Sequence, residues 1–327
     1  MTEGICREQC VRMRRRGWWA ILLGRGAALI WLFGVLGFAL FFSGEAAGYV
    51  IDGLSLAVFS VLPTAIPSML VCDIYRCYGH PERLGILGRI FGRVFGVSPS
   101  GLRAYILGNL FGFPMGAREV GIAHRDGGMS SEEAERLLPL ATNPSPAFVV
   151  GAVGGAMMGD FRRGILLLLC VWSASVLVGV MFRKNIVKSQ TIDIVSGQNY
   201  NAVESIKSIG GASLTIISFI SAFSVVLGIC EKYVLFLPLK YVLFAVLEVA
   251  RGVSFFLKNE AFSGGILGSF SGVFAAFSLG FGGLSVMLQS AAFVSEFGLK
   301  MRRYLPLKML QGLLSALLFL AVDLWVL

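Results

Sequence analysis

Charged residues are scarce in this 327-residue chain. They make up 14% of it, whereas the hydrophobic set AVILMFWYC accounts for 56% and there are 41 glycines in addition. Because a soluble domain carries about 25% charged residues, this composition argues against a water-soluble fold. Several uncharged runs match the roughly 20 residues that an α-helix needs to cross a ~30 Å hydrocarbon core. The sequence therefore predicts an all-α polytopic membrane protein.

Histidine and cysteine are also scarce. The chain has 2 histidines and 6 cysteines, and the cysteines are scattered along it. A structural zinc site needs four nitrogen or sulfur ligands at close spacing, and the few acids and histidines form no recognisable catalytic set. We therefore expect free thiols, no metal, no cofactor and no enzymatic activity.

The net charge of +9 does not indicate a nucleic-acid partner. The sequence has no basic patch interleaved with aromatic residues and no nucleic-acid-binding motif. Basic residues instead collect in the short cytoplasmic loops of membrane proteins. The excess of positive charge is thus explained by orientation in a lipid bilayer.

Residues 1–48 predict a basic N-terminus followed by a first transmembrane anchor. An arginine-rich start leads to Trp18 and Trp19 and then to an uncharged run of 19 residues at 26–44. No small-x-small cleavage site follows this run, so we expect a retained anchor rather than a signal peptide. The positive charge before the anchor predicts an N-terminus in the cytoplasm.

Two of the later apolar runs do not have the length of a single crossing. The runs 53–72, 164–182 and 208–230 have ordinary spanning length, whereas 104–117 is too short and 261–295 is too long. These two runs need another explanation.

Polar segments divide the chain further. Residues 83–96 have helical spacing, which fits either a basic amphipathic helix on the cytoplasmic surface or a plain connecting helix. The basic segments 183–188 and 300–308 are expected in the cytoplasm. The predicted organisation is a basic N-terminus and anchor at 1–48, repeat 1 at 49–183, a polar linker at 184–207 and repeat 2 at 208–327.

The two repeats are inferred from matched landmarks. Residues 53–75 align without gaps on 211–233, with six identities in 23 positions. Downstream, Phe111-Gly112 has a counterpart in Phe281-Gly282. The segments 136–140 and 303–307 also share Arg, Leu-Pro and Leu. Three landmarks in one order predict duplication, and we favour inverted over parallel halves, although charge counting does not settle the parity.

Glycine and proline interrupt the two runs of unusual length. Pro114 obstructs a continuing helix in the first run, and seven glycines interrupt residues 261–295. Such a pair of interrupted segments marks the solute site of duplicated secondary transporters. We therefore predict two broken or re-entrant helical hairpins that meet near the midplane. Each glycine taken alone also fits close packing between helices.

A further break is predicted at residues 142–146, where Pro144 and Pro146 would free carbonyl groups to face a cavity. Before it, Ser130 and Glu133 fit a capping box that starts a helix.

Polar groups beside these breaks form the candidate solute site. Arg118 would pair with a solute carboxylate at membrane depth, or alternatively with Glu119, or its charged end would reach water. Gln289 offers a donor and an acceptor, either to a solute or to a neighbouring helix. The candidate substrate-binding residues are Asn109, Pro114, Gly116, Arg118, Thr142, Asn143, Ser145, Gly283, Ser285 and Gln289.

Four motifs carry a family resemblance. They are Phe-Pro-Met-Gly-Ala at 113–117, Ser-Glu-Glu-Ala-Glu-Arg-Leu at 131–137, Asn-Pro-Ser-Pro-Ala-Phe at 143–148, and Gly-Gly-Leu-Ser-Val at 282–286 followed by Gln289. From about residue 53 to the end, the chain resembles the YlbJ family of sporulation integral membrane proteins. That family lies within the wider nucleoside-recognition or gate-domain group, which is related to concentrative nucleoside transporters.

The resemblance implies a transporter that works by alternating access and moves dipicolinate into the developing spore. Dipicolinate is a small planar aromatic dianion. The implied location is the mother-cell-derived outer forespore membrane. The implied partners are this small-molecule anion and the lipid bilayer, without nucleic acid. A homo-oligomer or contacts with other sporulation membrane proteins stay open.

The sequence leaves two alternative functions open. One is transport of a nucleoside or another small metabolite, and the other is a membrane scaffold required for sporulation that carries no solute. A polar, solute-sized cavity between the breaks would favour transport, whereas a dry, fully packed centre would favour the scaffold.

Overall fold

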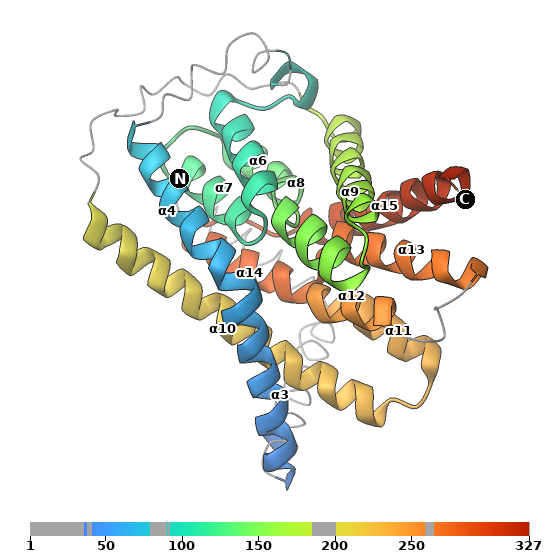
Figure 1. The fold of residues 1–327 in the computed structure, drawn as a ribbon. Coiled ribbons are helices and arrows are strands. Elements are labelled where there is room, and N and C mark those ends of the chain that lie inside the picture. Colours follow the sequence, from blue (N-terminus) through green and yellow to red (C-terminus); the bar gives the residue numbers. More distant parts are fainter. Residues whose placement is uncertain are drawn as a thin grey trace, which may run out of the picture. The chain divides into compact units, whose positions relative to one another are not determined.

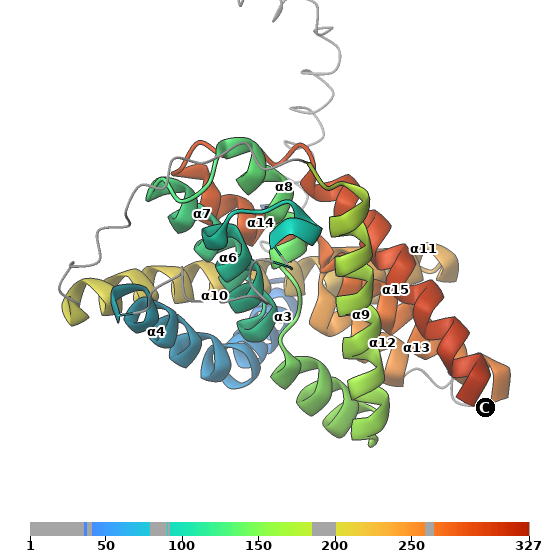
Figure 2. The ribbon, with the colours of Figure 1, turned by 90° about the horizontal axis from the view of Figure 1, so that it is seen from above.

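The computed structural model describes an all-helical chain (Figures 1 and 2). The described residues are 36–37, 41–78, 90, 92–184, 201–258 and 265–326, and no strand occurs among them. The predicted N-terminal arginines and tryptophans, and most of the predicted amphipathic helix at 83–96, lie outside these residues.

The chain divides into two compact units, Met1–Ile51 and Asp52–Leu327. The described part of the first unit is helical and includes the start of helix α3. All residues of the candidate site belong to the second unit.

The helices of the described residues lie in two series, one before and one after residues 185–200. The first series is α3 (Ser43–Leu56), a π-helical turn η1 (Ala57–Val61), α4 (Leu62–Tyr78), α6 (Pro99–Phe111), α7 (Met115–Arg125), α8 (Ser131–Ala141), the π-helix η3 (Ala147–Met157) and α9 (Phe161–Met181). The second is α10 (Ala202–Tyr233), α11 (Leu237–Leu247), α12 (Val249–Lys258), α13 (Gly265–Phe281), α14 (Gly283–Ser295) and α15 (Tyr304–Val326).

Five helical segments of the described chain are long and apolar enough to cross a membrane. They are Ser43–Tyr75, Phe161–Met181, Ala202–Tyr233, Phe270–Ser295 and Tyr304–Asp323. Large apolar side chains on them face outward, among them Phe59, Leu169, Leu214 and Leu317, with exposed fractions of 79%, 52%, 66% and 61%. Because a soluble protein rarely exposes so much apolar surface, these faces are suited to lipid. The multi-pass prediction is confirmed.

Polar side chains start several helices where the sequence predicts a cap. Ser130 Oγ accepts a hydrogen bond from Glu133 N at 3.2 Å, which confirms the start of α8. The Glu133 carboxylate reaches across to the start of α6, where its Oε1 accepts from Ser98 N at 2.6 Å. Asn201 caps α10 one residue before Ala202. The last part of the predicted linker at 184–207 is therefore helical.

Three helix ends meet at one side of the second unit. Glu132, at the start of α8, forms an ion pair with Lys184, which follows α9, and lies 3.7 Å from the guanidinium of Arg303, just before α15. The hydrogen bond and charge of Lys184 lower the pKa of the exposed Glu132 carboxyl. Helix α9 therefore ends, and α15 begins, on the same side, and the two helices pack together (Figures 1 and 2).

Candidate solute site

Four interruptions of the helices define the centre of the second unit. The first is residues 112–114 between α6 and α7, and the second is residues 142–146 between α8 and η3. The third is Glu248 between α11 and α12, and the fourth is Gly282 between α13 and α14. The breaks at 112–114, 142–146 and 282 are those that proline and glycine predict.

The third break was not predicted from the sequence. The second hairpin was predicted within residues 261–295, where Gly282 separates α13 from α14 inside the candidate span Phe270–Ser295. The helix pair that follows α10, as α6 and α7 follow α4, is α11 and α12, which pack together. Since the break at Glu248 contains neither glycine nor proline, the sequence pattern did not reveal it.

The breaks contact one another in two pairs through glycines. Gly112 has a φ of +83°, and a Cβ there would lie 2.6 Å from Ser145 N in the second break. Gly283 has a φ of +78°, and a Cβ there would lie 3.2 Å from Val249 N, beside the third break. Positive φ and close backbone approach both favour glycine. The first break thus contacts the second, and the fourth contacts the third.

A cavity lies where these breaks meet. About 50 Å³ of it can hold the centre of a water-sized sphere, within about 570 Å³ of space that no atom fills and that includes open solvent. Its wall includes the π-helical turn η1 and the start of α4, residues at three of the breaks, and the first turns of α14. The lining residues are Ser60, Val61, Thr64, Ala65, Phe111, Phe113, Ser145, Phe148, Ile220, Glu248, Val249, Ala250, Val286 and Gln289.

The cavity combines aromatic surface with a few polar groups. Phe111, Phe113 and Phe148 supply three rings, while hydroxyl and amide groups come from both series of helices. Gln289 is buried, and its Nε2 donates to Ser285 Oγ at 3.1 Å, which leaves its carbonyl oxygen as an acceptor at the wall. A mostly apolar pocket with a few convergent polar groups is typical of small-molecule sites.

Glu248 is the one ionisable side chain of this lining. It is 3% exposed, and its Oε2 accepts a hydrogen bond from Arg251 N at 2.6 Å, so the carboxylate caps α12. The Arg251 guanidinium is directed elsewhere, with Nη2 2.9 Å from Asp52 Oδ2. A solute in the cavity therefore meets a carboxyl group and no basic side chain.

Behind the cavity wall, polar side chains link the second break to α15. Asn143 Nδ2 donates to Asn109 Oδ1 at 2.8 Å, and Asn143 Oδ1 accepts from Gln311 Nε2 at 2.6 Å. Thr142 Oγ1 lies 3.0 Å from the Tyr304 hydroxyl. Lys308 Nζ donates to Thr142 O at 2.9 Å. Helices α6 and α15 and the second break therefore form one buried network.

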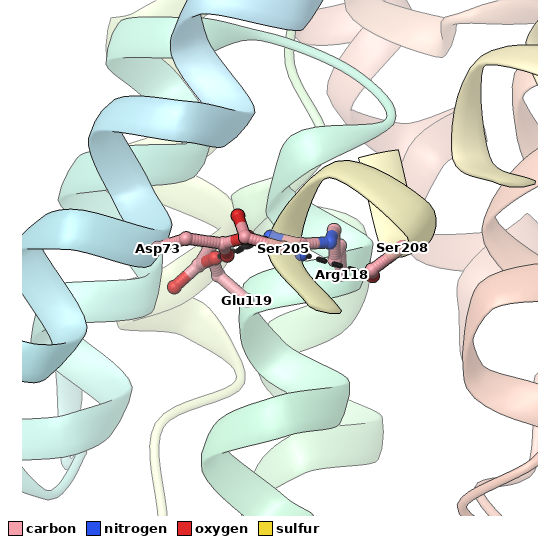
Figure 3. A network of polar contacts seen from close by, with 5 residues as sticks. All are labelled: Asp73, Arg118, Glu119, Ser205 and Ser208. Carbon is pink, nitrogen blue, oxygen red and sulfur yellow. Dashed lines mark hydrogen bonds and ion pairs between the residues drawn. The ribbon is translucent and has the colours of Figure 1, made fainter. Parts of the chain in front are cut away.

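Arg118 lies apart from the cavity in a second network (Figure 3). Its Nη1 and Nη2 donate to the two carboxylate oxygens of Asp73 at 2.8 and 3.1 Å, and its Nη2 also donates to Ser208 Oγ at 3.3 Å. Ser205 Oγ donates to Asp73 Oδ2 at 2.6 Å, and Glu119 Oε1 is 3.6 Å from Arg118 Nη1. The ion pair is buried and joins α4, α7 and the start of α10. Its guanidinium already has a carboxylate partner within the chain.

The ten predicted site residues thus fall into separate places. Ser145 and Gln289 line the cavity, and Ser285 supports Gln289 from within the same helix. Gly116 packs against the backbone, because a Cβ there would lie 1.9 Å from Ala141 O. Of the others, Pro114 and Gly283 lie at breaks, Asn109, Thr142 and Asn143 belong to the network behind the wall, and Arg118 pairs with Asp73.

Two of the buried charges at the helix breaks were not anticipated. Glu248 was not among the predicted site residues, and Lys308 was assigned to a cytoplasmic basic segment, whereas the structure buries Lys308 completely inside α15. Three neutral oxygens around its ammonium group make this placement feasible. They come from residues far apart in the sequence and from Gln311, so the local pattern at 300–308 did not show them.

Comparison with known proteins finds one related sequence. The sporulation integral membrane protein YlbJ of Bacillus subtilis (strain 168) is 28% identical over 132 residues, which are 40% of this chain and 32% of that protein. The similarity therefore spans about a third of the relative's length. No family model and no solved structure matches the chain. Together with the five apolar helices of the described residues, the relative indicates a multi-pass membrane protein.

Proposed function

We propose that the protein is a membrane transporter whose solute binds in the cavity between the helix breaks. The observation that carries the proposal is the cavity itself, with three phenylalanine rings from the first series of helices and polar groups from both series. Irregular backbone at membrane depth is tolerated where it is buried in protein or lines a cavity. A scaffold would need neither the breaks nor the cavity, so transport is the better explanation.

The two series are proposed to be inverted repeats. Corresponding positions in the element order pair α6–α7 with α11–α12, α8–η3 with α13–α14, and α9 with α15. Since α9 ends and α15 begins on the same side, these two counterparts cross in opposite directions. Inverted repeats allow one half to rock against the other around a central site. In this pairing, Phe111-Gly112 and Phe281-Gly282, which the sequence analysis matched to each other, are no longer counterparts.

The first candidate solute is a small aromatic carboxylate, and the family resemblance points to dipicolinate. The three phenylalanine rings suit a planar ring, and Ser145 and Gln289 supply hydrogen-bonding groups. An anionic solute also meets Glu248, and like charges repel each other strongly in a low dielectric. We therefore expect the carboxylate of Glu248 to weaken the binding of a dianion relative to an uncharged solute of similar shape.

The second candidate solute is a nucleoside, which Glu248 favours because a nucleoside carries no negative charge. A base would fit among the rings, and ribose hydroxyls would donate to the carboxylate. By resemblance we place the protein in the outer forespore membrane with its N-terminus in the cytoplasm.

Uptake into proteoliposomes tests these proposals. The purified protein is reconstituted, and uptake of labelled dipicolinate and labelled uridine is measured, each with the other as competitor. Saturable dipicolinate uptake that uridine leaves unchanged supports the first solute, whereas uridine uptake supports the second. Absence of uptake of either solute, in protein shown to be folded, would contradict the proposed function.

Substitutions of lining residues test whether the transported solute binds in the cavity. Gln289→Leu and Glu248→Gln should change the apparent affinity for the solute by about tenfold or more, since a buried hydrogen bond to a charged group contributes about 1.5–3 kcal/mol. Ser295→Ala is the matched control, because Ser295 is exposed on the same helix as Gln289. If both lining variants transport like the wild type, the cavity is not the solute site.

A further inference from the structure

Lys308 is an ammonium group without exposed surface, inside the candidate span Tyr304–Asp323. Its Nζ donates to Thr142 O at 2.9 Å, to Asn143 Oδ1 at 3.0 Å and to Gln311 Oε1 at 3.2 Å. All three hydrogen-bond capacities of the ammonium group are therefore used. All three acceptors are neutral.

Among the residues that the structure describes, no carboxylate forms an ion pair with Lys308. Helix α15 packs against α13, α9 and α8, and none of the ionisable groups on these helices bonds to Lys308. The hydroxyl group of Tyr304 pairs with Thr142 Oγ1 and that of Tyr105 pairs with Ser175 Oγ, so neither is bonded to Lys308. The ionisable groups on the packed helices are Arg162, Arg163 and Cys170 on α9, Glu132, Glu133, Glu135 and Arg136 on α8, and Tyr304 and Asp323 on α15, whereas α13 has none.

The protonated form of a buried lysine with only neutral partners is stabilised by its hydrogen bonds alone. Burial in a low dielectric penalises the charged form, and hydrogen bonds to that form favour it. The charge of Lys308 therefore depends on the three oxygens staying in place. If the oxygens withdraw, the neutral amine becomes the stable form, because a buried unpaired charge loses its proton rather than persist.

Two of these oxygens belong to the second helix break. Thr142 O and Asn143 Oδ1 lie two or three residues before Ser145 of the cavity wall. The ammonium group also lies at the fourth break, since a Cβ at Gly282 would be 3.9 Å from Lys308 Nζ. Movement of either break during solute binding would thus alter the surroundings of Lys308 directly.

We propose that Lys308 is a proton-binding site that couples the movement of a proton to the transport cycle. This inference rests on the proposed function. In one state the amine takes a proton from water on one side of the membrane and becomes an ammonium ion held by Thr142, Asn143 and Gln311. In the other state the break moves, the oxygens withdraw, and the ammonium ion returns the proton to water on the opposite side. No redox partner or further reactant is needed.

A measurement that does not depend on transport tests the titration. Protein labelled with ¹⁵N at the lysine Nζ is placed in lipid nanodiscs, and the Nζ chemical shift separates ammonium from amine. The signal that disappears in Lys308→Gln belongs to Lys308. We expect it to change between the ammonium and the amine form when the pH is varied, before the signals of the exposed lysines change. A signal that remains ammonium, or remains amine, over the whole range overturns the proposal.

A pH gradient tests the coupling. At one proton per solute, a gradient of one pH unit drives about tenfold accumulation of the solute. Wild-type proteoliposomes should show this accumulation and lose it with a protonophore. Lys308→Gln should lose the accumulation while keeping solute exchange between the two sides, which needs no net proton transfer. Lys300→Gln, a change at an exposed lysine, is the matched control and should accumulate solute normally.

The outcomes separate the two proposals. Gradient-independent uptake by the wild type overturns the coupling and leaves transport standing. Loss of both exchange and accumulation in Lys308→Gln, with folded protein, assigns Lys308 a structural role and also overturns the coupling. Wild-type protein that transports no solute contradicts the proposed function, and the coupling proposal falls with it even where Lys308 titrates.

Discussion

Asp73 and Arg118 show how a charged residue beside a helix break acquires a local partner. The sequence analysis left two roles open for Arg118, a solute contact or an ion pair within the chain, and the structure provides a bidentate pair with Asp73. The partner lies 45 residues earlier in the sequence. No local spacing rule would identify it.

Removing one member of this pair should destabilise the protein. Asp73→Asn leaves the guanidinium of Arg118 buried without a full counter-charge, and a broken buried pair costs about 3–5 kcal/mol of unfolding free energy. Unfolding in mixed micelles monitored by circular dichroism measures this change. The double variant Asp73→Leu with Arg118→Met should recover most of the loss, since neither charge then remains.

An exposed pair provides the control. Arg125 and Asp126 are 2.8 Å apart, with side-chain exposed fractions of 56% and 34%. Arg125→Ala should change the free energy of unfolding by about 1 kcal/mol or less. If Asp73→Asn is equally mild, the Arg118 network contributes little to stability.

Lys308 and Gln289 mark the limits of residue-scale prediction. Gln289 could be identified because an amide in a long apolar run needs a partner. Lys308 was misassigned because a lysine that directly precedes an apolar run resembles the end of a helix at the membrane surface. Only the oxygens of Thr142 and Asn143, brought there by the fold, distinguish the two situations.

At the scale of the elements, glycine and proline predicted three of the four breaks because they act locally. Pro114 obstructs a helix wherever it occurs, and Gly112 adopts a φ of +83° that other residues rarely adopt. The break at Glu248 has no such local signal. There the helix ends although its residues permit helix, and a carboxylate caps the next helix.

Adding a methyl group at the first break should be costly. In Gly112→Ala the new Cβ would lie 2.6 Å from Ser145 N at a positive φ, so we expect a loss of about 1–3 kcal/mol in unfolding free energy. Thermal unfolding in detergent, with uptake assayed in parallel, measures it.

Gly211→Ala is the matched control for this change. Gly211 lies inside α10, and a Cβ there would have no heavy atom within 4 Å. Alanine should be neutral or stabilise the helix by up to about 1 kcal/mol. Equal effects of the two substitutions would contradict a role for the close contact between the first and second breaks.

At the scale of the whole second unit, composition and run length were sufficient for the all-helical membrane class. The pairing of the halves was not accessible in the same way. Weak identities in apolar helices aligned residues 53–75 with 211–233, and the duplication that they indicate stays a prediction. The direction of α9 and α15 became clear only from the contacts of Glu132.

The opposite directions of α9 and α15 have a testable consequence. Cysteines introduced at Lys184 and Lys300, in a chain without native cysteines, should react with a membrane-impermeant maleimide from the same side of the membrane. A cysteine at Met158, before α9, should react from the other side. Reaction of positions 184 and 300 from opposite sides would exclude the inverted arrangement.

The most direct test of the account is access to the cavity from the two sides of the membrane. Ser145→Cys places a thiol in the cavity wall, and Ser175→Cys, fully buried in α9, is the control that should stay unreactive. An alternating-access transporter predicts that a small impermeant thiol reagent modifies position 145 from either side and that the transported solute protects it. Modification from one side only, unaffected by dipicolinate or uridine, would contradict the central claim that this cavity carries a solute across the membrane.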